Sequence, residues 1–422
     1  MSELALTGGT AAVAGHLHRP WPEITLADRQ AIDGVLDRGV LAGPNAPEIR
    51  SLEEEYAQYV GVRHCVATNA GTSALHAALA AAGVGPEHEV IVPAYTFVAS
   101  AFAVAQQGAR VVFCDVDEAT GNLDATRLEG LITRSTRAIM AVHIHGQPAD
   151  MDEINAIAAR NGVLVVEDSS QAHGTRYRGR RAGGLAHAAG ASMNHSKNLP
   201  AGEGGLFTTD DEVLALTARR LVLYGEDVIM GQPRQYWSHG LGWNYRGHEM
   251  TYALARSQLR RLDSYNERAR ENADRLTKGL AGLAGIDLPR IAPDRESSFW
   301  RYSVRVQPEE LGFDGDPREL RDRIVRALSA EGVEAFVWQP QPIPAQPAFR
   351  RHMQAWHPRV EAEPLRPWEP SDFPIASRLC DTSFSLGTMR HPLYVQDPEL
   401  MDLYVVAVRK VLANIPTVMR MD

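Results

Sequence analysis

Lysine is rare in this chain, and one lysine lies where an amine could do chemistry. Of the 43 basic side chains only three are lysines: Lys197, Lys278 and Lys410. Lys278 and Lys410 fall in helical patterns, where a cation has ordinary structural roles. Lys197 follows a short predicted strand and precedes a glycine-rich turn, in ASMNHSKNLPAGEGG. An amine in this position is a candidate Schiff-base nucleophile, and the alternative is a lysine on a surface loop.

A carboxylate lies at the end of a predicted buried strand, in VVEDSSQAHG. The apolar run 163–166 leads into Glu167 and Asp168, which places Asp168 at the carboxyl end of that strand. A carboxylate held there can pair with a protonated ring nitrogen, the partner that pyridoxal phosphate needs to act as an electron sink. Alternatively, Asp168 caps a turn together with Ser169 and Ser170.

An anion site is indicated by NAGTSAL, residues 69–75. Gly71 makes a turn after a predicted strand, and Thr72 and Ser73 open a helix. Free backbone N–H groups and two hydroxyls suit a phosphate monoester. Thr and Ser are also the usual helix N-caps, so simple capping is the alternative. No Walker lysine follows, which disfavours a nucleoside triphosphate.

Other catalytic patterns are weaker. His143 and His145 are two residues apart on a predicted strand, so they would share a face and could bind a metal. The sequence supplies no further ligand, and a histidine lining the crevice or the core is the better interpretation. No G-x-S-x-G, S-x-x-K or strand-linked G-x-G-x-x-G is present, which disfavours a serine nucleophile and a dinucleotide site.

The elements that must position these residues alternate between strand and helix. This alternation predicts βαβ units, and therefore an α/β domain with a mostly parallel sheet whose strands carry the functional residues at their carboxyl ends. The predicted strands are 65–68, 90–92, 111–116, 138–144 and 163–166. The predicted helices are 47–60, 72–82, 97–106, a short one near 128, and 151–160.

The second half of the chain predicts a smaller α+β lobe. A long helical pattern over 249–282 is interpreted as the bridge to it. A strand with alternating burial over 300–306, a helix over 319–330, a strand over 334–338 and a final helix over 398–415 follow. Residues 340–374 hold nine of the 25 prolines and four aromatic residues. They predict an ordered, packed loop, either a pocket cover or an insertion without a role at the site.

Composition excludes several classes of protein. With 422 residues, 44% hydrophobic and 23% charged, the chain is that of a globular protein rather than a disordered one. A formal charge of −9 argues against a nucleic-acid partner. Three scattered cysteines favour a reducing compartment. We see no signal peptide and no apolar run near the ~20 residues that cross a bilayer, so we expect a cytoplasmic protein without a membrane partner.

Five motifs, taken in order, resemble one known family. GTSAL, PAYTFVAS, VFCDVD, VEDSSQAHG and SMNHSKN with GEGG resemble the DegT/DnrJ/StrS-type sugar aminotransferases, which are pyridoxal-phosphate enzymes of fold type I. The resemblance runs from about Trp21 to the last helix. It implies a large α/β domain with a mostly parallel seven-stranded sheet and a smaller α+β C-terminal domain. The implied boundaries are an arm at 1–20, the large domain at 21–265 and the small domain at 266–422.

The resemblance implies roles for matching positions. As catalytic residues, Lys197 would form the Schiff base with pyridoxal 5′-phosphate and Asp168 would contact the pyridine nitrogen. Phe97 would stack on the ring, and Gln171 would lie by the ring hydroxyl. Asn244, in GWNYRGHEM, would reach the phosphate of a neighbouring subunit, which implies a homodimer with shared active sites. The full implied cofactor-binding set, with no metal, is Gly71, Thr72, Ser73, Phe97, Asp168, Gln171, Ser192, Lys197 and Asn244, in which Thr72, Ser73 and Ser192 hold the phosphate.

The implied activity is transfer of an amino group from glutamine or glutamate to a ketone on a cyclitol or a sugar, as in antibiotic or aminosugar biosynthesis. The long C-terminal segment beginning SFWRYSVRV favours a cyclitol. One alternative is a nucleotide keto-sugar aminotransferase. Another is a pyridoxal- or pyridoxamine-phosphate-dependent dehydratase, which is disfavoured because such relatives replace the lysine with histidine. Outside enzymes, the alternative is a cofactor-binding regulatory homologue.

Overall fold

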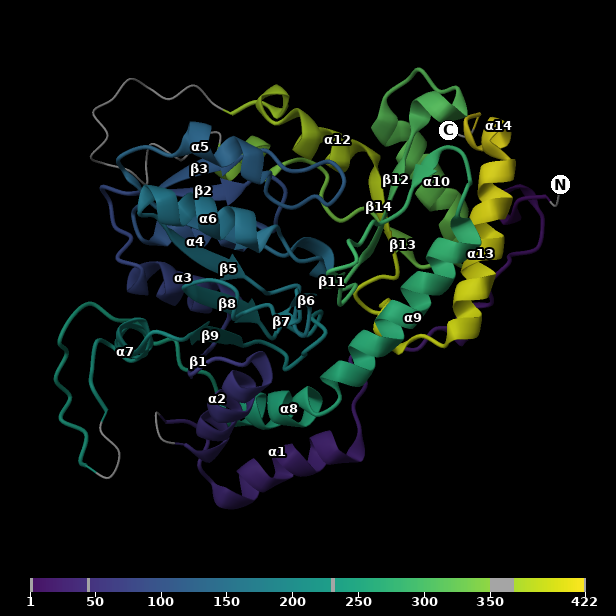
Figure 1. Ribbon diagram of the computed structural model, residues 1–422. Coiled ribbons are helices and arrows are strands. Elements are labelled where there is room, and N and C mark those ends of the chain that lie inside the picture. Colours follow the sequence, from purple (N-terminus) through teal and green to yellow (C-terminus); the bar gives the residue numbers. More distant parts are fainter. Residues whose placement is uncertain (1–2, 44–45, 229–231, 350–367, 421–422) are drawn as a thin grey trace.

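The computed structural model describes residues 3–43, 46–228, 232–349 and 368–420, and its largest sheet has seven strands (Figure 1). The strands lie in the order β1-β9-β8-β5-β4-β2-β3. Strand β9 is antiparallel to both neighbours, and the other pairs are parallel. This confirms the predicted sheet. Its strands are β1 (His64–Thr68), β2 (Glu89–Pro93), β3 (Arg110–Cys114), β4 (Thr136–Val142), β5 (Leu164–Asp168), β8 (Ala188–Ser192) and β9 (Gly205–Thr209).

Helices cover both faces of this sheet, because successive strand residues point to opposite sides. In β2, Val90 and Val92 are buried in one hydrophobic core and Ile91 in another. The first core includes residues of α3, α4 and α7, and the second includes residues of α6. The helices of this part are α2 (Pro47–Val60), α3 (Gly71–Ala81), α4 (Val98–Gln106), α5 (Leu128–Leu131), α6 (Met151–Asn161), α7 (Glu212–Val222) and α8 (Glu249–Leu259).

A second, four-stranded antiparallel sheet forms from the C-terminal part, in the order β10-β12-β14-β13. Tyr302, Val304 and Val306 alternate into its core, as their spacing predicts. Its strands are β10 (Ile286–Asp287), β12 (Tyr302–Val306), β13 (Ala335–Phe336) and β14 (Ser383–Leu386), with helices α10 (Pro317–Ala330), α12 (Pro374–Thr382), α13 (Pro398–Ala413) and α14 (Ile415–Val418). A third, small sheet consists of β11 (Arg295–Glu296), β6 (Arg176–Tyr177) and β7 (Arg180–Arg181).

Helix α9 (Leu262–Leu280) joins the two sheets, and Figure 1 shows it running from beside α8 up to the second sheet. The expected domain boundary at 265/266 falls inside this continuous helix and stays a prediction. The expected arm at residues 1–20 contains two short turns, Ala5–Thr7 and Gly15–Leu17. Leu4 and Val13 of this arm are buried in the core of the second sheet.

Three of the differences between the expectations and the structure concern α1, the long helical pattern and the end of β4. Helix α1 (Leu26–Arg38) was not predicted, because among its residues only Asp28 and Val35 are buried and its apolar stripe is weak. The long pattern over 249–282 is two helices, α8 and α9. The strand expected to reach residue 144 ends at Val142, so His143 and His145 lie beyond it and share no strand face.

The proline-rich segment 340–374 falls partly outside the described residues, which exclude 350–367 and hence Trp356. At its described ends, Phe349 and Phe373 are buried, and their ring centroids lie 5.3 and 6.1 Å from that of Phe113 on β3. Both ends are therefore packed, as predicted. A role as a pocket cover stays a prediction.

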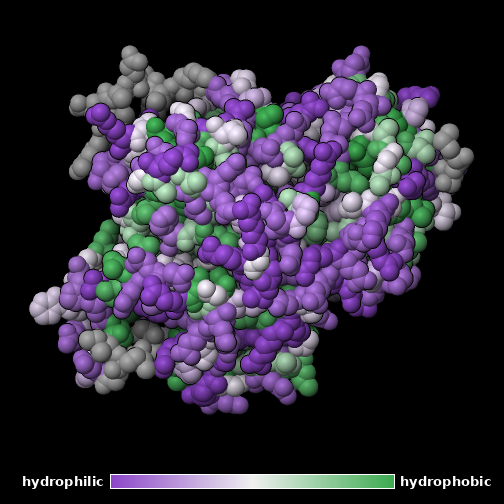
Figure 2. Space-filling view, viewed as in Figure 1, coloured by the Kyte–Doolittle hydropathy of each residue, from purple (hydrophilic) through white to green (hydrophobic). Residues whose placement is uncertain are grey.

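The face in Figure 2 is mainly hydrophilic, with hydrophobic residues in several small groups. Among the described helices, none combines the length and the apolar character that a membrane span requires.

Candidate active site

Asp168 ends strand β5, as predicted, and its side chain is fixed on both sides. It is 5% exposed. Its Oδ2 accepts a hydrogen bond from Ser100 Oγ (2.7 Å), and its Oδ1 accepts one from the backbone N–H of Ser170 (3.1 Å). The second bond is the turn cap that the sequence offered as the alternative. Ser100 lies on α4 and was missed in the sequence, because only the fold brings α4 beside the end of β5.

Lys197 lies in the loop between β8 and β9, and this loop is held by three aromatic side chains. Trp300 Nε1 and Tyr394 Oη donate to the backbone oxygen of Ser196 (2.8 and 3.2 Å). Trp21 Nε1 donates to the backbone oxygen of Lys197 itself (3.1 Å). The Lys197 ammonium lies 4.2 Å from the centroid of the Trp300 ring. The amine is therefore carried by a rigid loop, not by a free surface turn.

The electrostatics of Lys197 set it apart from the other lysines. Lys278 pairs with Asp274 (2.6 Å) and Lys410 with Glu331 (2.8 Å), whereas Lys197 makes no ion pair with any described residue. Burial lowers the pKa of Lys197 to about 8. The positive charge of Arg301 acts in the same direction, and the carboxylate of Asp168 opposes both. A lowered pKa makes a lysine a better nucleophile and base near neutral pH.

The residues of the predicted anion site lie where α3 meets the end of β8. A Cβ placed on Gly71 would lie 2.5 Å from the Cβ of Ser192, so glycine is what lets the helix N-terminus approach this strand. The N-cap is Ala70, which offers no side-chain acceptor. Thr72 and Ser73 lie in the first turn, so the alternative that they are N-caps is wrong. The structure thus brings the N-terminus of α3 and Ser192 together.

Three further predicted site residues differ in exposure and in the hydrogen bonds that they already make: Phe97, Gln171 and Asn244. Phe97 precedes α4, and the residue is 52% exposed. Gln171 is buried, and its Oε1 accepts a hydrogen bond from the backbone N–H of His145 (2.7 Å). Asn244 is exposed, and its Oδ1 accepts from Arg246 (3.0 Å). It adjoins Tyr245, whose backbone oxygen accepts from the N–H of Asn69 just before α3 (2.6 Å).

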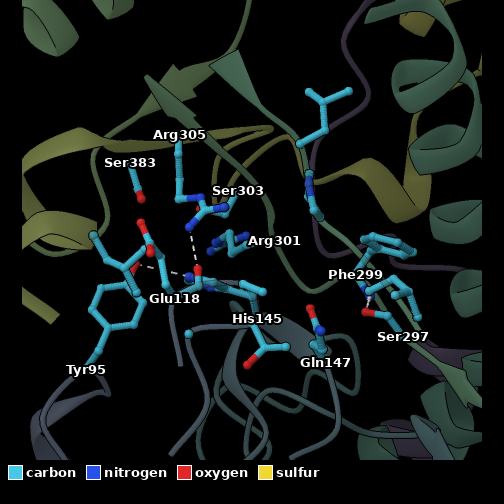
Figure 3. A pocket seen from close by; sticks show the side chains of 17 residues that line it. Tyr95, Glu118, His145, Gln147, Ser297, Phe299, Arg301, Ser303, Arg305 and Ser383 are labelled. Carbon is cyan, nitrogen blue, oxygen red and sulfur yellow. Dashed lines mark hydrogen bonds between the residues drawn. The ribbon is translucent and has the colours of Figure 1, made fainter. Parts of the chain in front are cut away.

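A pocket between the two sheets contains His145, which the sequence placed in the crevice or the core, and Arg301, which sequence reasoning missed (Figure 3). His145 lines it and has a backbone φ of 57°, in the left-handed region that is unusual for a residue other than glycine. Its Nε2 lies 3.2 Å from Tyr95 Oη, and its Nδ1 is buried without a hydrogen-bond partner among the described residues. Burial lowers the pKa of His145 to about 3, and the charge of Arg301 adds to this, so the imidazole is neutral.

The donor set fits the chemical groups of pyridoxal phosphate. The amine suits the aldehyde, and the fixed carboxylate suits the pyridine nitrogen. The exposed aromatic ring suits the flat ring, and the helix N-terminus suits the phosphate. His143 Nε2 instead contacts buried Glu167 (2.9 Å). Within the described residues, no group of three or more His, Cys, Asp or Glu side chains could hold a metal ion.

Comparisons with known proteins show what the chain is similar to. The sequence model of the DegT/DnrJ/EryC1/StrS aminotransferase family matches residues 22–365. The dTDP-3-amino-3,4,6-trideoxy-alpha-D-glucose transaminase of Streptomyces venezuelae is 39% identical over 336 residues, covering 79% of this chain and 83% of the relative. The L-glutamine:2-deoxy-scyllo-inosose aminotransferase of Streptomyces paromomycinus is 40% identical over 322 residues, covering 73% and 75%. The solved structure of S. venezuelae DesV in complex with a ketimine intermediate matches with a TM-score of 0.78 and 34% identity, covering 94% of this chain and 95% of that one.

Proposed function

The chain belongs to the DegT/DnrJ/EryC1/StrS aminotransferase family, and we propose that it uses pyridoxal 5′-phosphate to move an amino group from glutamine or glutamate to a ketone on a cyclitol or sugar ring. That it is an aminotransferase follows from the family and from the relatives named as transaminases. The observation that carries the cofactor proposal is Lys197, a half-buried amine of lowered pKa that faces no counter-ion among the described residues.

We propose the cofactor contacts that the family resemblance implies for matching positions of this chain. Lys197 would bond to the aldehyde carbon, and Asp168, held by Ser100, would keep the pyridine nitrogen protonated. Phe97 would stack on the ring, and Gln171 would lie by the ring hydroxyl. The phosphate would lie against the helix N-terminus, which carries a partial positive charge. Its proposed contacts are Gly71, Thr72, Ser73 and Ser192, with Asn244 supplied by a second subunit.

Each step of the reaction needs a proton held or moved by this chain. When bound, pyridoxal phosphate supplies an electron sink that stabilises negative charge on the carbon next to the transferred nitrogen. Lys197 would be the base that holds the proton removed from that carbon and gives it back. A pKa of about 8 lets this amine gain and lose a proton near neutral pH. Asp168 would keep the proton on the pyridine nitrogen throughout the reaction, because Ser100 and the Ser170 N–H fix its carboxylate.

For the acceptor we propose a keto-cyclitol, with a nucleotide keto-sugar as the second candidate. One 40% identical relative is named for an inosose, and one 39% identical relative is named for a dTDP-linked sugar. Dehydration is disfavoured because the nucleophile position holds Lys197, while His195 is exposed two residues earlier. The three cysteines are unpaired and buried, which supports a reducing compartment such as the cytoplasm.

We also propose a homodimer with shared active sites. The segment that follows α7 extends away from the body at the lower left of Figure 1. It exposes large apolar side chains: Tyr236 is 75% exposed, Trp237 69% and Leu241 79%. Exposed apolar side chains gathered on one segment are typical of a protein interface. Asn244 lies at the end of this segment, where a partner subunit could use it.

A half-reaction assay followed by a ketone panel tests the proposal. We expect glutamine or glutamate alone to convert the bound cofactor to its amino form, seen as a change in its absorption spectrum. Inososes, free keto-sugars and nucleotide keto-sugars would then be supplied in turn. The highest kcat/KM for an inosose supports the cyclitol proposal, and the highest value for a nucleotide keto-sugar replaces it with the second candidate. Failure of every amino donor would contradict aminotransfer from these donors.

A further inference from the structure

Arg301 is a buried cation without a counter-ion among the described residues. Arg301 lies just before β12 and is only 3% exposed. Its Nη1 donates to the backbone oxygen of Trp300 (3.1 Å). Its Nε and Nη2 are both buried and have no hydrogen-bond partner. A buried charge left unpaired is strongly destabilising, so the fold retains this arginine at a cost to stability.

The unpartnered atoms form one edge of the guanidinium. The N–H groups of Nε and Nη2 point the same way and are spaced to meet the two oxygens of one carboxylate. The remaining nitrogen, Nη1, is the one already bonded within the protein. The unsatisfied part of Arg301 is therefore a bidentate site for a planar, two-oxygen anion, rather than three scattered donors.

The guanidinium is held in place by packing, not by ion pairs. Its central carbon lies 4.1 Å from the centroid of the Trp300 ring and 5.3 Å from that of Phe336. The backbone N–H of Arg301 donates to the oxygen of His145 (3.3 Å). The Trp300 ring also carries the Lys197 ammonium at 4.2 Å. One indole thus links the free arginine edge to the amine that does the chemistry.

The surrounding pocket contains a second arginine that is already satisfied. Figure 3 shows Arg301 between Arg305 and His145. Arg305 pairs with Asp287 (3.2 Å) and also donates to the backbone oxygen of Glu118. Glu118, the acidic residue of the pocket lining, lies 3.8 Å from Arg378. Its carboxylate is not paired with Arg301, so the Arg301 edge remains free for a ligand.

We propose that Arg301 binds the carboxylate of the amino donor through its Nε and Nη2 edge and so orients the donor toward Lys197. This inference rests on the proposed function, in which the donor is an amino acid and the acceptor is a ketone on a hydroxylated ring. The donor is the substrate that carries a carboxylate. Ser297 and Ser303 line the same pocket as Arg301.

The test compares Arg301→Gln, Arg301→Lys and the matched control Arg305→Gln as holoenzymes. For the half-reaction with glutamine or glutamate, we expect Arg301→Gln to raise KM and lower kcat/KM roughly 100-fold, the effect of removing one partner of a buried charge pair. Arg301→Lys should recover part of the loss, and Arg305→Gln should stay within about threefold. The ketone half-reaction, started from the amino form of the cofactor, should stay within about threefold in all three variants.

A donor without a carboxylate sharpens the result. With an amine that has the glutamine side chain and hydrogen in place of the carboxylate, wild type should react far more slowly than with glutamine. Arg301→Gln should treat the two alike. Retained discrimination in Arg301→Gln would overturn the proposal. A loss confined to the ketone half-reaction would also overturn it, and would assign the edge to an anionic group of the acceptor.

A binding measurement separates this inference from the proposed function. Glutarate, a dicarboxylate without an amine, should bind the wild-type holoenzyme in a calorimetric titration. It should bind the Arg301→Lys holoenzyme more weakly and should not bind the Arg301→Gln holoenzyme. Binding of glutarate by wild type alone supports the site even if no amino donor reacts, in which case only the proposed function fails. Equal binding by wild type and Arg301→Gln, or no binding by either, overturns the site. Thermal unfolding checks that the variants are folded.

Discussion

At the scale of single residues, one indole ring serves two cations. The Trp300 centroid lies 4.2 Å from the Lys197 ammonium and 4.1 Å from the Arg301 guanidinium. Cation–π attraction offsets part of the cost of burying each charge, up to about 2 kcal/mol where water is excluded. It does so without supplying a hydrogen-bond acceptor. The amine of Lys197 and the free edge of Arg301 therefore remain available to ligands.

The lowered pKa of Lys197 implies a stability cost that depends on pH. Folding disfavours the protonated amine, so the cost is full below pH 8, shrinks as pH rises toward the value of a free lysine, and vanishes above it. In cofactor-free protein at pH 7 we expect Lys197→Met to be more stable by about 2 kcal/mol, a value reduced for the solvent that reaches the amine. Urea unfolding at pH 7 and pH 9.5 measures this.

The matched control is Lys278→Met, which removes an exposed lysine paired with Asp274. It should change stability by less than about 1 kcal/mol at both pH values. A Lys197→Met protein that is no more stable than wild type, or whose advantage grows with pH, would show that the amine is not desolvated in the way described.

The site residues predicted from the sequence are those that their neighbours in the sequence mark out. Lys197 was found because it is one of three lysines and follows a strand, and Asp168 because it ends an apolar run. Ser100 and Arg301 could not be found this way. Their roles come from contacts with residues far along the chain, Ser100 with Asp168 and Arg301 with the pocket around His145.

At the scale of elements, the close approach of α3 to β8 depends on Gly71. A methyl group there would meet Ser192 Cβ at 2.5 Å, so either the helix or the strand end must move. We expect Gly71→Ala to weaken cofactor binding at least tenfold, because displacing the helix N-terminus removes charge and N–H groups from the phosphate. Equilibrium dialysis with pyridoxal phosphate measures the change in Kd.

The control for this prediction is Gly61→Ala, a glycine at the end of α2 with open space around its Cβ position but a φ of 92°. It should cost some stability through backbone strain while leaving the cofactor Kd unchanged. Equal Kd values for Gly71→Ala and wild type would contradict the proposal that the phosphate binds at this helix N-terminus.

Elements were predicted best where burial imposes a period. Helix α2 has its predicted bounds, because its buried residues keep one stripe. Helix α1 was missed because most of it is exposed, although Thr25 and Asp28 form a capping box that marks its start. The end of β4 was misplaced because the apolar run continues past Val142 into Ile144, where the chain turns at His145.

At the scale of the whole molecule, the mostly parallel sheet could be predicted from the alternation of strands and helices. The proposed pairing of subunits rests on the family resemblance and on the exposed segment after α7.

Mixing two inactive variants tests the proposed sharing of active sites between subunits. In mixed dimers of Lys197→Ala and Asn244→Ala, one of the two sites would draw an intact Lys197 and an intact Asn244 from different subunits. After random reassortment of equal amounts we expect about a quarter of wild-type activity.

The control mixture is Lys197→Ala with Asp168→Ala. Both residues serve the same subunit's site, so each site of a mixed dimer keeps one defect and activity should not return. Recovery in the first mixture and none in the second supports sharing. No recovery in either mixture, with mixed dimers verified by mass, would contradict it.

The central claim, that Lys197 bonds covalently to pyridoxal phosphate, is tested most directly by trapping that bond. The holoenzyme is reduced with borohydride, digested, and its peptides are sequenced by mass spectrometry. We predict that the peptide containing Lys197 carries the added mass of a reduced pyridoxyl phosphate, while those of Lys278 and Lys410 are unmodified. An unmodified Lys197 in protein reconstituted with the cofactor, or modification at one of the other two lysines instead, would contradict the account.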